Sequence, residues 1–310
     1  MMAATGDFHF VTFGAGQEWP QAAERLARQA RATRIFASIS VETGDTIFDR
    51  YPEFRRHASF VQANPRGWGY WLWKPFLIQQ HLRRLPDGAV LLYLDAGCEI
   101  FPRNARKLAA LLEIARDREA MILDYAELPV LNVAFWSKQS LLDKIAQDFA
   151  SDIEQIRIPA VSAGTLAFRK TPRAQMLIED WFSLASSDGY QYLDDAPSAT
   201  PQRQLFFRTL HDQSILGLLV SHHRLETCGD ALFYDYLSAQ VDQWPGFLLR
   251  KPFLLMRNAS GRSQVSRWQK LRAWSPFQSD NAMGRFGATK TAVLKLTERR
   301  RDDLTALGLG

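Results

Sequence analysis

The chain has 310 residues, of which 46% are hydrophobic and 23% are charged, with a formal net charge of +5. This length and composition allow a full buried core and exclude an intrinsically disordered protein. Cys98 and Cys228 lie far apart and lack CxxC or Cys/His spacing, which argues against a structural zinc site and a disulfide framework. Because no apolar run reaches about 18 residues, we expect no membrane span. The start of the chain lacks a leader pattern, so a cytoplasmic protein is expected.

The positive charge is concentrated toward the C-terminal end. Residues 250–310 hold 13 Lys and Arg against 4 Asp and Glu, a net charge of +9 that leaves −4 for residues 1–249. Aromatic residues such as Trp268 and Trp274 alternate with these cations, which suits an anionic membrane surface. A solvated tail would have the same composition. No helix-turn-helix, finger or RNP-like motif accompanies the charge, so no nucleic-acid partner is expected.

Strand-like and helical segments alternate along most of the chain. This pattern predicts an α/β fold with a Rossmann-like, mostly parallel central sheet that is covered on both faces. The composition changes near residue 246, which divides the chain into a domain over 1–246 and a basic extension over 247–310. Strands are expected at 8–13, 34–41, 89–95, 120–124 and 161–168, and helices at 20–29, 73–84, 104–116, 137–149, 172–185 and 202–220.

The turn after the first strand contains Gly14 and Gly16, as in part of a dinucleotide-binding fingerprint. Trp19 stands at the third glycine position, which weakens the match, while Glu42 lies near the place of the ribose-binding acid. An NAD-type enzyme or a nucleotidyltransferase therefore stays an alternative. The sequence lacks GxxxxGK[ST], GxSxG and HExxH, so it gives no support for P-loop, α/β-hydrolase or zincin chemistry.

The strand that ends at Asp95 predicts a ligand site. It is short, apolar and bounded by turn residues, and ligands bind at the carboxyl ends of strands in open α/β sheets. A carboxylate at such a position needs a cation, backbone donors or a ligand, because an unpaired buried charge is costly. The alternative role of Asp95 is a helix N-cap or an Asx-turn.

The segment 64–75 combines four aromatic residues with two glycines and two cations. Aromatic faces stack on sugars or bases, glycines permit close approach of the backbone, and Arg66 or Lys74 can neutralise a diphosphate. Trp71 and Trp73 could equally be core residues that lead into the next helix.

Three motifs in order give the chain a resemblance to bacterial glycosyltransferases with the A-type nucleotide-sugar fold. They are Arg66-Gly-x-Gly-Tyr-Trp-x-Trp-Lys-Pro75, then Leu92-Tyr-Leu-Asp-Ala-Gly-Cys-Glu99, then His211-Asp-Gln-Ser-Ile-Leu216. The resemblance runs from about Phe10 to Leu218. Proteins of this kind are associated with capsule or lipopolysaccharide assembly. A more distant similarity links the chain to family 8 glycosyltransferases, in which an Asp-x-Asp motif ends a comparable strand.

The resemblance implies a site and a role for each of its residues. Donor-binding residues would be Phe13, Gly14, Arg66, Tyr70, Trp73, Lys74, Asp95, Ala96, Gly97, Ser162, Ala163 and Gly164. Asp212 and Gln213 would be catalytic, through contacts to sugar hydroxyls or the acceptor. Asp95, Glu99 and His211 would bind Mn²⁺ or Mg²⁺, the cations that hard oxygen ligands favour. Gly97 replaces the second aspartate of the Asp-x-Asp motif, and Glu99 would share a face with Asp95 if the strand continued.

The activity that follows is transfer of a sugar, as in a hexosyltransferase. The donor would be a UDP- or GDP-linked sugar and the acceptor a glycan or a lipid-linked sugar, in cell-surface polysaccharide synthesis at the inner face of the plasma membrane. A noncatalytic sugar-binding or assembly protein on the same fold is an alternative. The general base of an inverting reaction stays open, because several acids qualify.

Overall fold

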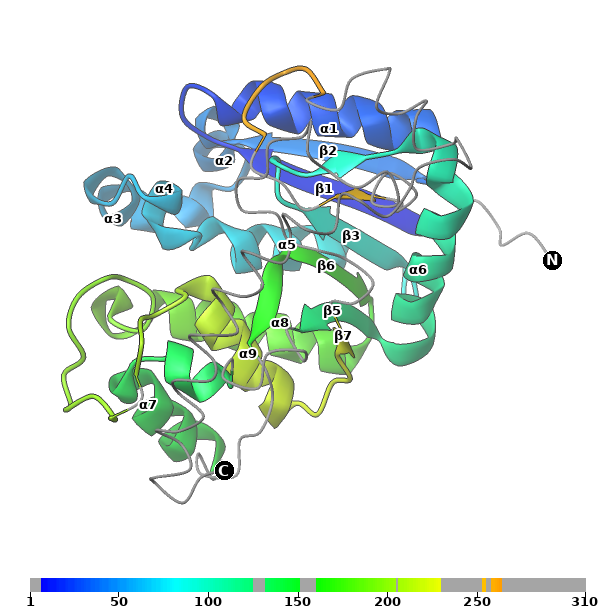
Figure 1. Cartoon of the computed structure of the whole chain (residues 1–310). Helices are drawn as coiled ribbons and strands as arrows, with labels where there is room; N and C mark the ends of the chain where they lie inside the picture. Colours follow the sequence, from blue (N-terminus) through cyan, green and yellow to red (C-terminus); the bar gives the residue numbers. More distant parts are fainter. Residues whose placement is uncertain are drawn as a thin grey trace, which may run out of the picture.

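A six-stranded sheet forms the centre of the computed structural model, which describes residues 7–124, 132–150, 160–204, 206–229, 253–254 and 258–263 (Figure 1). Its strand order is β2-β1-β3-β6-β5-β7. The strands are β1 (Phe8–Gly14), β2 (Ser38–Thr43), β3 (Val90–Leu94), β5 (Ala120–Asp124), β6 (Val161–Arg169) and β7 (Cys228–Gly229). The pairs β1–β2, β1–β3 and β5–β7 are parallel, whereas β6 is antiparallel to both β3 and β5. Five strands thus run one way, and the α/β fold with a mostly parallel sheet is confirmed.

Helices cover both faces of this sheet. The longer ones are α1 (Trp19–Thr33), α5 (Trp73–Arg84), α6 (Ala105–Arg118), α7 (Gln139–Phe149), α8 (Pro172–Ser186) and α9 (Asp212–His222). Shorter helical turns are α2 (Gly44–Arg50), η1 (Pro52–His57), α3 (Ala58–Ala63), α4 (Gly67–Tyr70), η2 (Pro102–Asn104), η4 (Val133–Trp136) and η6 (Asp188–Tyr190). Local capping explains several helix starts: Pro20 lies in the first turn of α1, and the Thr171 hydroxyl accepts a hydrogen bond from the Ala174 N–H at the start of α8.

Helix α1 continues to Thr33, beyond its expected end at 29. Two further sequence-based boundaries also differ from the structure. The expected strand over 34–41 begins only at Ser38, because Arg34 ends α1 in the left-handed conformation with φ of 59°. The expected helix over 202–220 begins only at Asp212, since His211 has φ of 58° and ψ of −123°, which no α-helix accommodates. Both differences arise from single residues with positive φ, which periodicity does not reveal.

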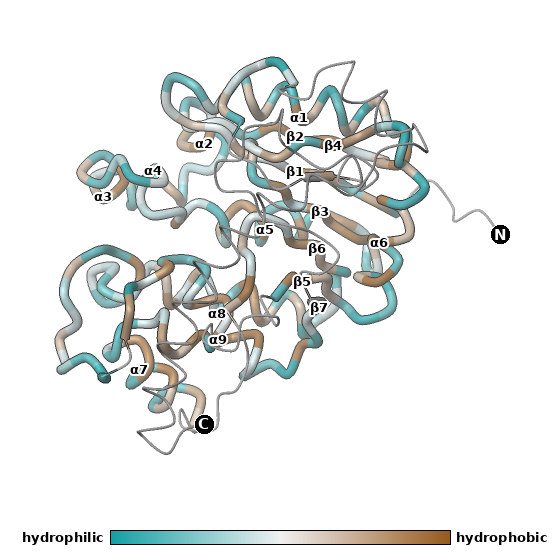
Figure 2. The backbone as a smooth tube through the Cα atoms, in the orientation of Figure 1, coloured by the Kyte–Doolittle hydropathy of each residue, from teal (hydrophilic) through white to brown (hydrophobic). Residues whose placement is uncertain are grey.

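Alternating strand residues build two apolar layers, one on each face of the sheet. Phe10 and Leu92 pack on one side with Leu26 of α1 and Leu108 of α6, and the strands and inner helix faces are accordingly apolar (Figure 2). The opposite face carries Tyr93. Burial of each large apolar side chain contributes about 1.5–3 kcal/mol, so these layers fix the sheet and its helices together.

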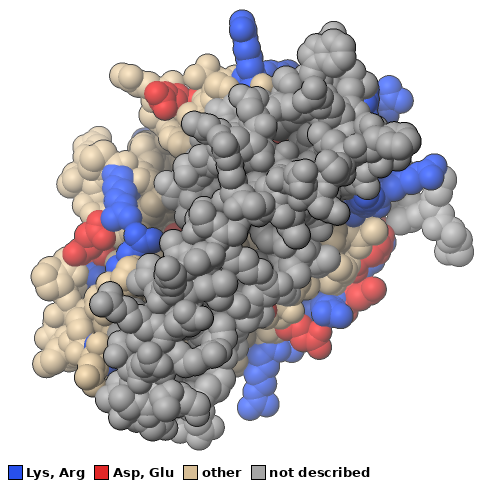
Figure 3. Space-filling view, in the orientation of Figure 1, with Lys and Arg blue, Asp and Glu red and all other residues tan. Residues whose placement is uncertain are grey.

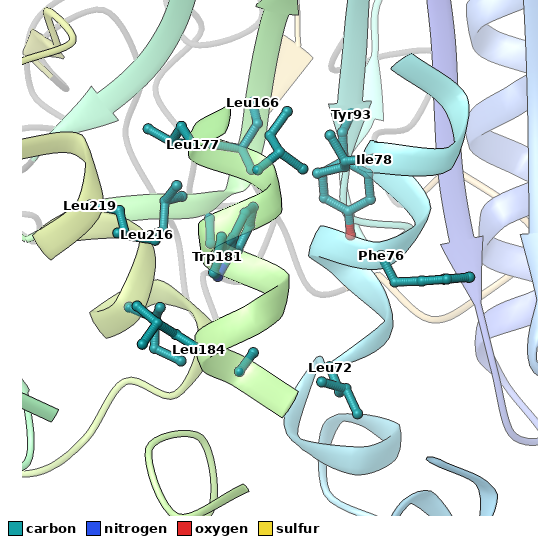
Figure 4. Packing of buried hydrophobic residues seen from close by; sticks show 14 of the residues in the cluster. Leu72, Phe76, Ile78, Tyr93, Leu166, Leu177, Trp181, Leu184, Leu216 and Leu219 are labelled. Atoms are coloured by element: carbon teal, nitrogen blue, oxygen red, sulfur yellow. The ribbon is translucent and has the colours of Figure 1, made fainter. Parts of the chain in front are cut away.

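The layer on the Tyr93 side joins the elements that later form the site. Side chains from β3, α5, α8 and α9 interlock there, with Trp181 of α8 fully buried among leucines (Figure 4). The Trp181 indole N–H donates to the Asp212 carbonyl oxygen at 2.9 Å. This contact fixes the first residue of α9 against α8, and therefore the position of Asp212.

The direction of β6 brings two motifs to the same edge of the sheet. Because β6 runs against β3, its first residues lie beside the end of β3, with Leu94 opposite Thr165. The Asp95 backbone N–H donates to the Gly164 carbonyl at 2.9 Å. Residues 162–164 therefore adjoin Asp95, although nearly 70 residues separate them along the chain.

A second, two-stranded sheet ties a late segment to the domain. Its strands are β4 (Glu99–Ile100) and β8 (Phe253–Leu254), which pair antiparallel. Asn258 is fully buried, and residues 258–263 contact α1 and β4.

The expected boundary at 246 and the aromatic, basic residues after 263 lie outside the described residues. On the face that Figure 3 shows, the visible Lys and Arg side chains of the described residues are interspersed with Asp and Glu. Among the described residues, no helix is long and apolar enough to cross a membrane.

Candidate active site

A buried lysine lies between two carboxylates at the carboxyl end of β3. The Lys74 ammonium is 3.0 Å from Oδ2 of Asp212 and 3.3 Å from Oδ1 of Asp95. The Lys74 and Asp212 side chains are 3% and 6% exposed, whereas Asp95 is 39% exposed. We call these three residues the carboxylate–lysine cluster. It joins all three motifs on which the resemblance rests, because Lys74 comes from α5, Asp95 follows β3 and Asp212 begins α9.

The charges in this cluster depend on one another. Burial alone would lower the pKa of Lys74, but Asp212 and Asp95 together raise it above its usual value, so the lysine is charged. Burial raises the pKa of Asp212 to about 6 against the opposing effect of Lys74, with a smaller contribution from the Asp95 charge. Asp212 therefore titrates near neutral pH, in the range useful for proton transfer.

One oxygen of Asp95 is held by the protein and the other faces open space. Oδ1 accepts the Tyr93 hydroxyl and contacts Lys74. Oδ2 points toward Gly164, where a Cβ atom would lie 3.0 Å from that oxygen and 3.9 Å from the Ser162 hydroxyl. The glycine therefore leaves room for a ligand atom in front of Oδ2, with a hydroxyl beside it.

The segment before Lys74 forms a turn of left-handed helix. Five consecutive residues, from Gly67 to Trp71, have φ between 51° and 82°. The Tyr70 N–H donates to Arg66 O and the Trp71 N–H to Gly67 O, which repeats the helical pattern in the opposite hand. A left-handed residue other than glycine costs roughly 1–2 kcal/mol, and such strain concentrates at functional sites.

The two glycines of this turn serve its backbone. A Cβ at Gly67 would meet the Trp71 ring at 2.6 Å, and one at Gly69 would meet Val61 at 2.8 Å. The sequence suggested that these glycines admit a ligand close to the backbone. In the structure these glycines permit positive φ and close packing within the protein. The turn determines where α5 begins and therefore where Lys74 lies.

A second polar group surrounds His211, the residue before Asp212. The Nδ1 atom of His211 donates to the Leu193 carbonyl at 2.8 Å, and Nε2 lies 3.7 Å from Oδ1 of Asp195. Tyr70 stacks on the imidazole at 4.9 Å between ring centroids. Asp195 also accepts a hydrogen bond from Arg66 at 2.8 Å. We call Arg66, Tyr70, Asp195 and His211 the histidine cluster.

Glu99 does not join Asp95, which corrects the predicted metal ligand set. Its carboxylate is fully buried and accepts hydrogen bonds from Asn258 at 3.0 Å and from Ser263. His211 lies in the histidine cluster, where its Nε2 atom is 3.7 Å from Asp195. Within the described residues, no group of three or more His, Cys, Asp or Glu side chains could hold a metal ion. The three predicted ligands therefore do not fit a shared Mn²⁺ or Mg²⁺.

Several predicted donor-binding residues are buried inside the protein. Phe13 and Trp73 stack on each other at 3.9 Å in the core and are 4% and 5% exposed. Ala163 is also a core residue. The Ala96 carbonyl accepts from Arg25 of α1, and the Gly97 carbonyl accepts from the Asn258 N–H of the late segment. These residues support the site from within the protein.

The two residues behind the dinucleotide alternative, Gly14 and Glu42, have contacts within the protein. At Gly14 a Cβ would lie 2.3 Å from the Trp19 carbonyl oxygen, so this glycine serves close packing of β1 against α1. Glu42 is fully buried and accepts hydrogen bonds from Arg50 at 2.7 Å and from Tyr51 at 3.3 Å, with His81 Nε2 at 3.0 Å. All three contacts involve Oε1, whereas Oε2 is buried and has no hydrogen-bond partner among the described residues.

Sequence reasoning missed Tyr93, Asp194 and Asp195. Tyr93 lies two residues before Asp95, and strand alternation alone would have placed both on the same face. Asp194 accepts a hydrogen bond at 2.7 Å from Lys138, whose side chain is 3% exposed. The two aspartates stand in a polar loop with no motif, so no signal in one sequence indicated them. Gln213 is half-buried, and its backbone N–H donates to Leu210 O at 3.2 Å.

Comparisons with known proteins give no family. No protein-family model matches the sequence, and a comparison with curated proteins finds no match. Among solved structures, mouse xyloside xylosyltransferase 1 in its apo form aligns with a TM-score of 0.40 and 14% identity over 80% of this chain and 96% of that one. A glycosyltransferase involved in glycosylation of the major capsid of PBCV-1 aligns with a TM-score of 0.41 and 10% identity over 86% of this chain and 98% of that one. Similarity of this size establishes neither a common family nor a common activity.

Proposed function

We propose that the chain is a glycosyltransferase that moves a sugar from a UDP- or GDP-linked donor to a glycan or lipid-linked acceptor in cell-surface polysaccharide synthesis. The observation that supports this most directly is the carboxylate–lysine cluster. It lies at the carboxyl end of β3, where ligands of open α/β sheets bind, and it draws on all three motifs of the glycosyltransferase resemblance.

The open oxygen of Asp95 suits recognition of a sugar hydroxyl. A carboxylate accepts strong hydrogen bonds, and Lys74 with the Tyr93 hydroxyl fixes this one in place through its other oxygen. The Ser162 hydroxyl, near the space that Gly164 leaves, supplies a further donor or acceptor. The half-exposed Arg66 guanidinium is the motif cation that a diphosphate can reach, since Lys74 is enclosed.

Transfer would replace one bond at the anomeric carbon by another. The acceptor oxygen bonds to that carbon as its bond to the diphosphate oxygen breaks, and the electron pair leaves with the nucleoside diphosphate. The buried Lys74 and Asp212 contribute by holding the Asp95 side chain in place before the reaction begins. The site then does not have to rearrange while the bonds change.

The experiment pairs a site variant with a matched surface variant. Purified protein is incubated with UDP-glucose, UDP-N-acetylglucosamine or GDP-mannose and a panel of nitrophenyl glycosides, and release of UDP or GDP is measured. Asp95→Asn should lower transfer about 10²–10³-fold, the loss typical when one positioned polar group is removed. Asp87→Asn, at a residue whose side chain is 94% exposed, should leave it unchanged.

The outcomes separate the alternatives. Tight binding of a sugar nucleotide without turnover would favour a noncatalytic sugar-binding protein. Binding of NAD in place of UDP or GDP would favour a dinucleotide enzyme. Equal transfer by the Asp95→Asn and Asp87→Asn proteins would refute the proposed site.

We also propose that the basic, aromatic residues after 263 hold the protein on the inner face of the plasma membrane. Each Lys or Arg near an anionic surface contributes about 1 kcal/mol. Co-sedimentation with phosphatidylserine-containing vesicles should fall sharply for a chain that ends after Ser263. That end point keeps the contacts of residues 258–263 with the domain. Equal sedimentation of the two chains would contradict membrane binding by the tail.

A further inference from the structure

One ring nitrogen of His211 makes a hydrogen bond within the protein, and the other makes none with the described residues. The Leu193 carbonyl can only accept a hydrogen bond, so Nδ1 must carry the proton that binds it. Nε2 of the neutral ring is then an acceptor. Although this atom is buried, it has no hydrogen-bond partner among the described residues. A buried acceptor without a donor is costly, and this one belongs to the residue that directly precedes Asp212 of the carboxylate–lysine cluster.

The surroundings hold this ring in place. Tyr70 stacks on it with an interplanar angle of 21°, and Trp71 lies at 5.5 Å on a tilted plane. Both aromatic residues come from the left-handed turn. His211 itself has φ of 58° and ψ of −123°, an uncommon conformation for a residue other than glycine. Strained backbone at both partners indicates that the position of the ring is specified by the fold rather than incidental.

The charged groups around Nε2 oppose one another. Burial lowers the pKa of His211, Arg66 and Lys138 lower it further, and Asp195 with the Leu193 carbonyl raises it. The ring is therefore neutral at pH 7, with Asp195 placed to stabilise an imidazolium if a proton arrives. Asp195, which accepts hydrogen bonds from Arg66 and Tyr70, is 45% exposed, so the group beside Nε2 reaches the protein surface.

We propose that His211 is the general base that takes the proton from the acceptor hydroxyl, with Asp195 as the residue that positions and stabilises the protonated ring. The inference rests on the proposed glycosyl transfer. The acceptor O–H gives its proton to Nε2, and its oxygen bonds to the anomeric carbon. The bond from that carbon to the diphosphate breaks and its electrons leave with the nucleoside diphosphate, and the proton later passes from His211 to water.

The test uses His211→Asn, because the asparagine amide can still donate to the Leu193 carbonyl but offers no base. The full chain is assayed with the donor and acceptor that give turnover in the experiment above. We expect kcat to fall about 10²–10⁴-fold, the usual contribution of a general base. Binding of UDP or GDP, measured by calorimetry, should stay within about twofold because the ring contacts the acceptor.

Two further variants distinguish a base from a structural residue. Loss of the Arg66 charge should raise the pKa of His211, so the acidic limb of the kcat profile should move to higher pH in Arg66→Gln. Loss of the Asp195 charge should move it to lower pH in Asp195→Asn. The pKa of Asp212, another group that titrates there, is set mainly by burial, Lys74 and Asp95. Opposite movements therefore identify His211 as the titrating group.

The outcomes separate this inference from the function on which it rests. If no donor is turned over by the wild-type protein, the proposed function fails and the inference falls with it. If the wild type is active and the His211→Asn protein transfers sugar at a similar kcat, only the inference is overturned. The same holds if the acidic limb stays in place in both Arg66→Gln and Asp195→Asn.

Discussion

Asp95 and Glu99 stand four residues apart on one loop and have opposite surroundings. Asp95 is 39% exposed and keeps one oxygen toward the space beside Gly164. Glu99 is fully buried and shares its oxygens between Gln29, Asn258 and Ser263. We call Arg25, Glu99, Asn258 and Ser263 the anchor cluster. Two acids that look equivalent in the sequence thus have different roles: Asp95 belongs to the candidate site, and Glu99 stabilises the fold.

Partners from distant segments create this difference. Arg25 donates four hydrogen bonds to carbonyls of Ala96, Cys98, Asn258 and Ser260, which fixes the loop against residues 258–260. Glu99 then meets donors on every side, and a carboxylate that the protein satisfies fully has no oxygen left for a ligand. Among the described residues, the Asp95 side chain meets only Lys74 and Tyr93, both at Oδ1. The unsatisfied oxygen marks the site better than the presence of an acid does.

The largest expected effect comes from removing the cation of the carboxylate–lysine cluster. Lys74→Met leaves Asp212 buried beside Asp95 without its counter-charge, and loss of one partner of a buried ion pair costs about 3–5 kcal/mol. Urea unfolding at pH 7 should show this loss. Lys144→Met, at a partly exposed lysine paired with Asp148, should cost at most about 1 kcal/mol.

A double variant separates charge from packing. Asp212→Asn in the Lys74→Met background removes the uncompensated charge and should recover part of the lost stability. If the double variant is as unstable as Lys74→Met alone, the loss comes from packing of the lysine stem, and the electrostatic account of the cluster is wrong.

The next effect is a dependence of stability on pH that originates at Asp212. Its pKa is about 6 in the folded protein and near 3.8 when unfolded, so the folded state holds the proton more tightly. Stability from this group is complete below about pH 4 and is lost as the pH rises through 6, a change of about 3 kcal/mol. The free energy of unfolding of Asp212→Asn, measured against wild type from pH 4 to 7.5, should therefore improve with rising pH. A constant difference would contradict this assignment.

Substitution in the anchor cluster should have the opposite effect to substitution in the site. The free energy of unfolding should fall, and ligand binding should be unchanged. Glu99→Gln retains the shape but loses the charge that Arg25 faces and turns an amide N–H₂ toward donors, at a cost of about 2 kcal/mol. Protein that remains folded should bind UDP or GDP as the wild type does. Asp95→Asn should show the reverse: weakened function with little change in the unfolding midpoint.

The sequence predicted the fold class because its cues were local and periodic. Alternation of strands and helices gave the layers, and the three motifs indicated Lys74, Asp95 and Asp212, which the structure brings together. The reversed direction of β6 was beyond such cues, since pairing partners far apart in the chain decide it. The role of Glu99 was equally hidden, because its partners follow about 160 residues later.

Glycine gave the most ambiguous signal in the candidate site. The same residue type serves close approach of a ligand, close packing of backbone and positive φ, and a single sequence does not distinguish these uses. Gly164 leaves space in front of a carboxylate, Gly14 admits the α1 backbone, and Gly67 and Gly69 permit a left-handed turn. The role of each glycine follows from the atoms that surround it in the fold.

The smallest expected effect tests whether that turn belongs to the site. Gly69→Ala adds a methyl group at φ of 82°, 2.8 Å from Val61, and should cost about 1–2 kcal/mol from strain alone, with more from the contact. Gly88→Ala is the matched control, because Gly88 has φ of 81° and no atom within 4 Å of the added Cβ. The difference between the two isolates packing of the turn. If the turn positions Lys74 and Tyr70, Gly69→Ala should also lower transfer, and Gly88→Ala, equally strained but at the far end of β3, should not. Equal activity of the two proteins would reduce the left-handed turn to a structural connection between α3 and α5.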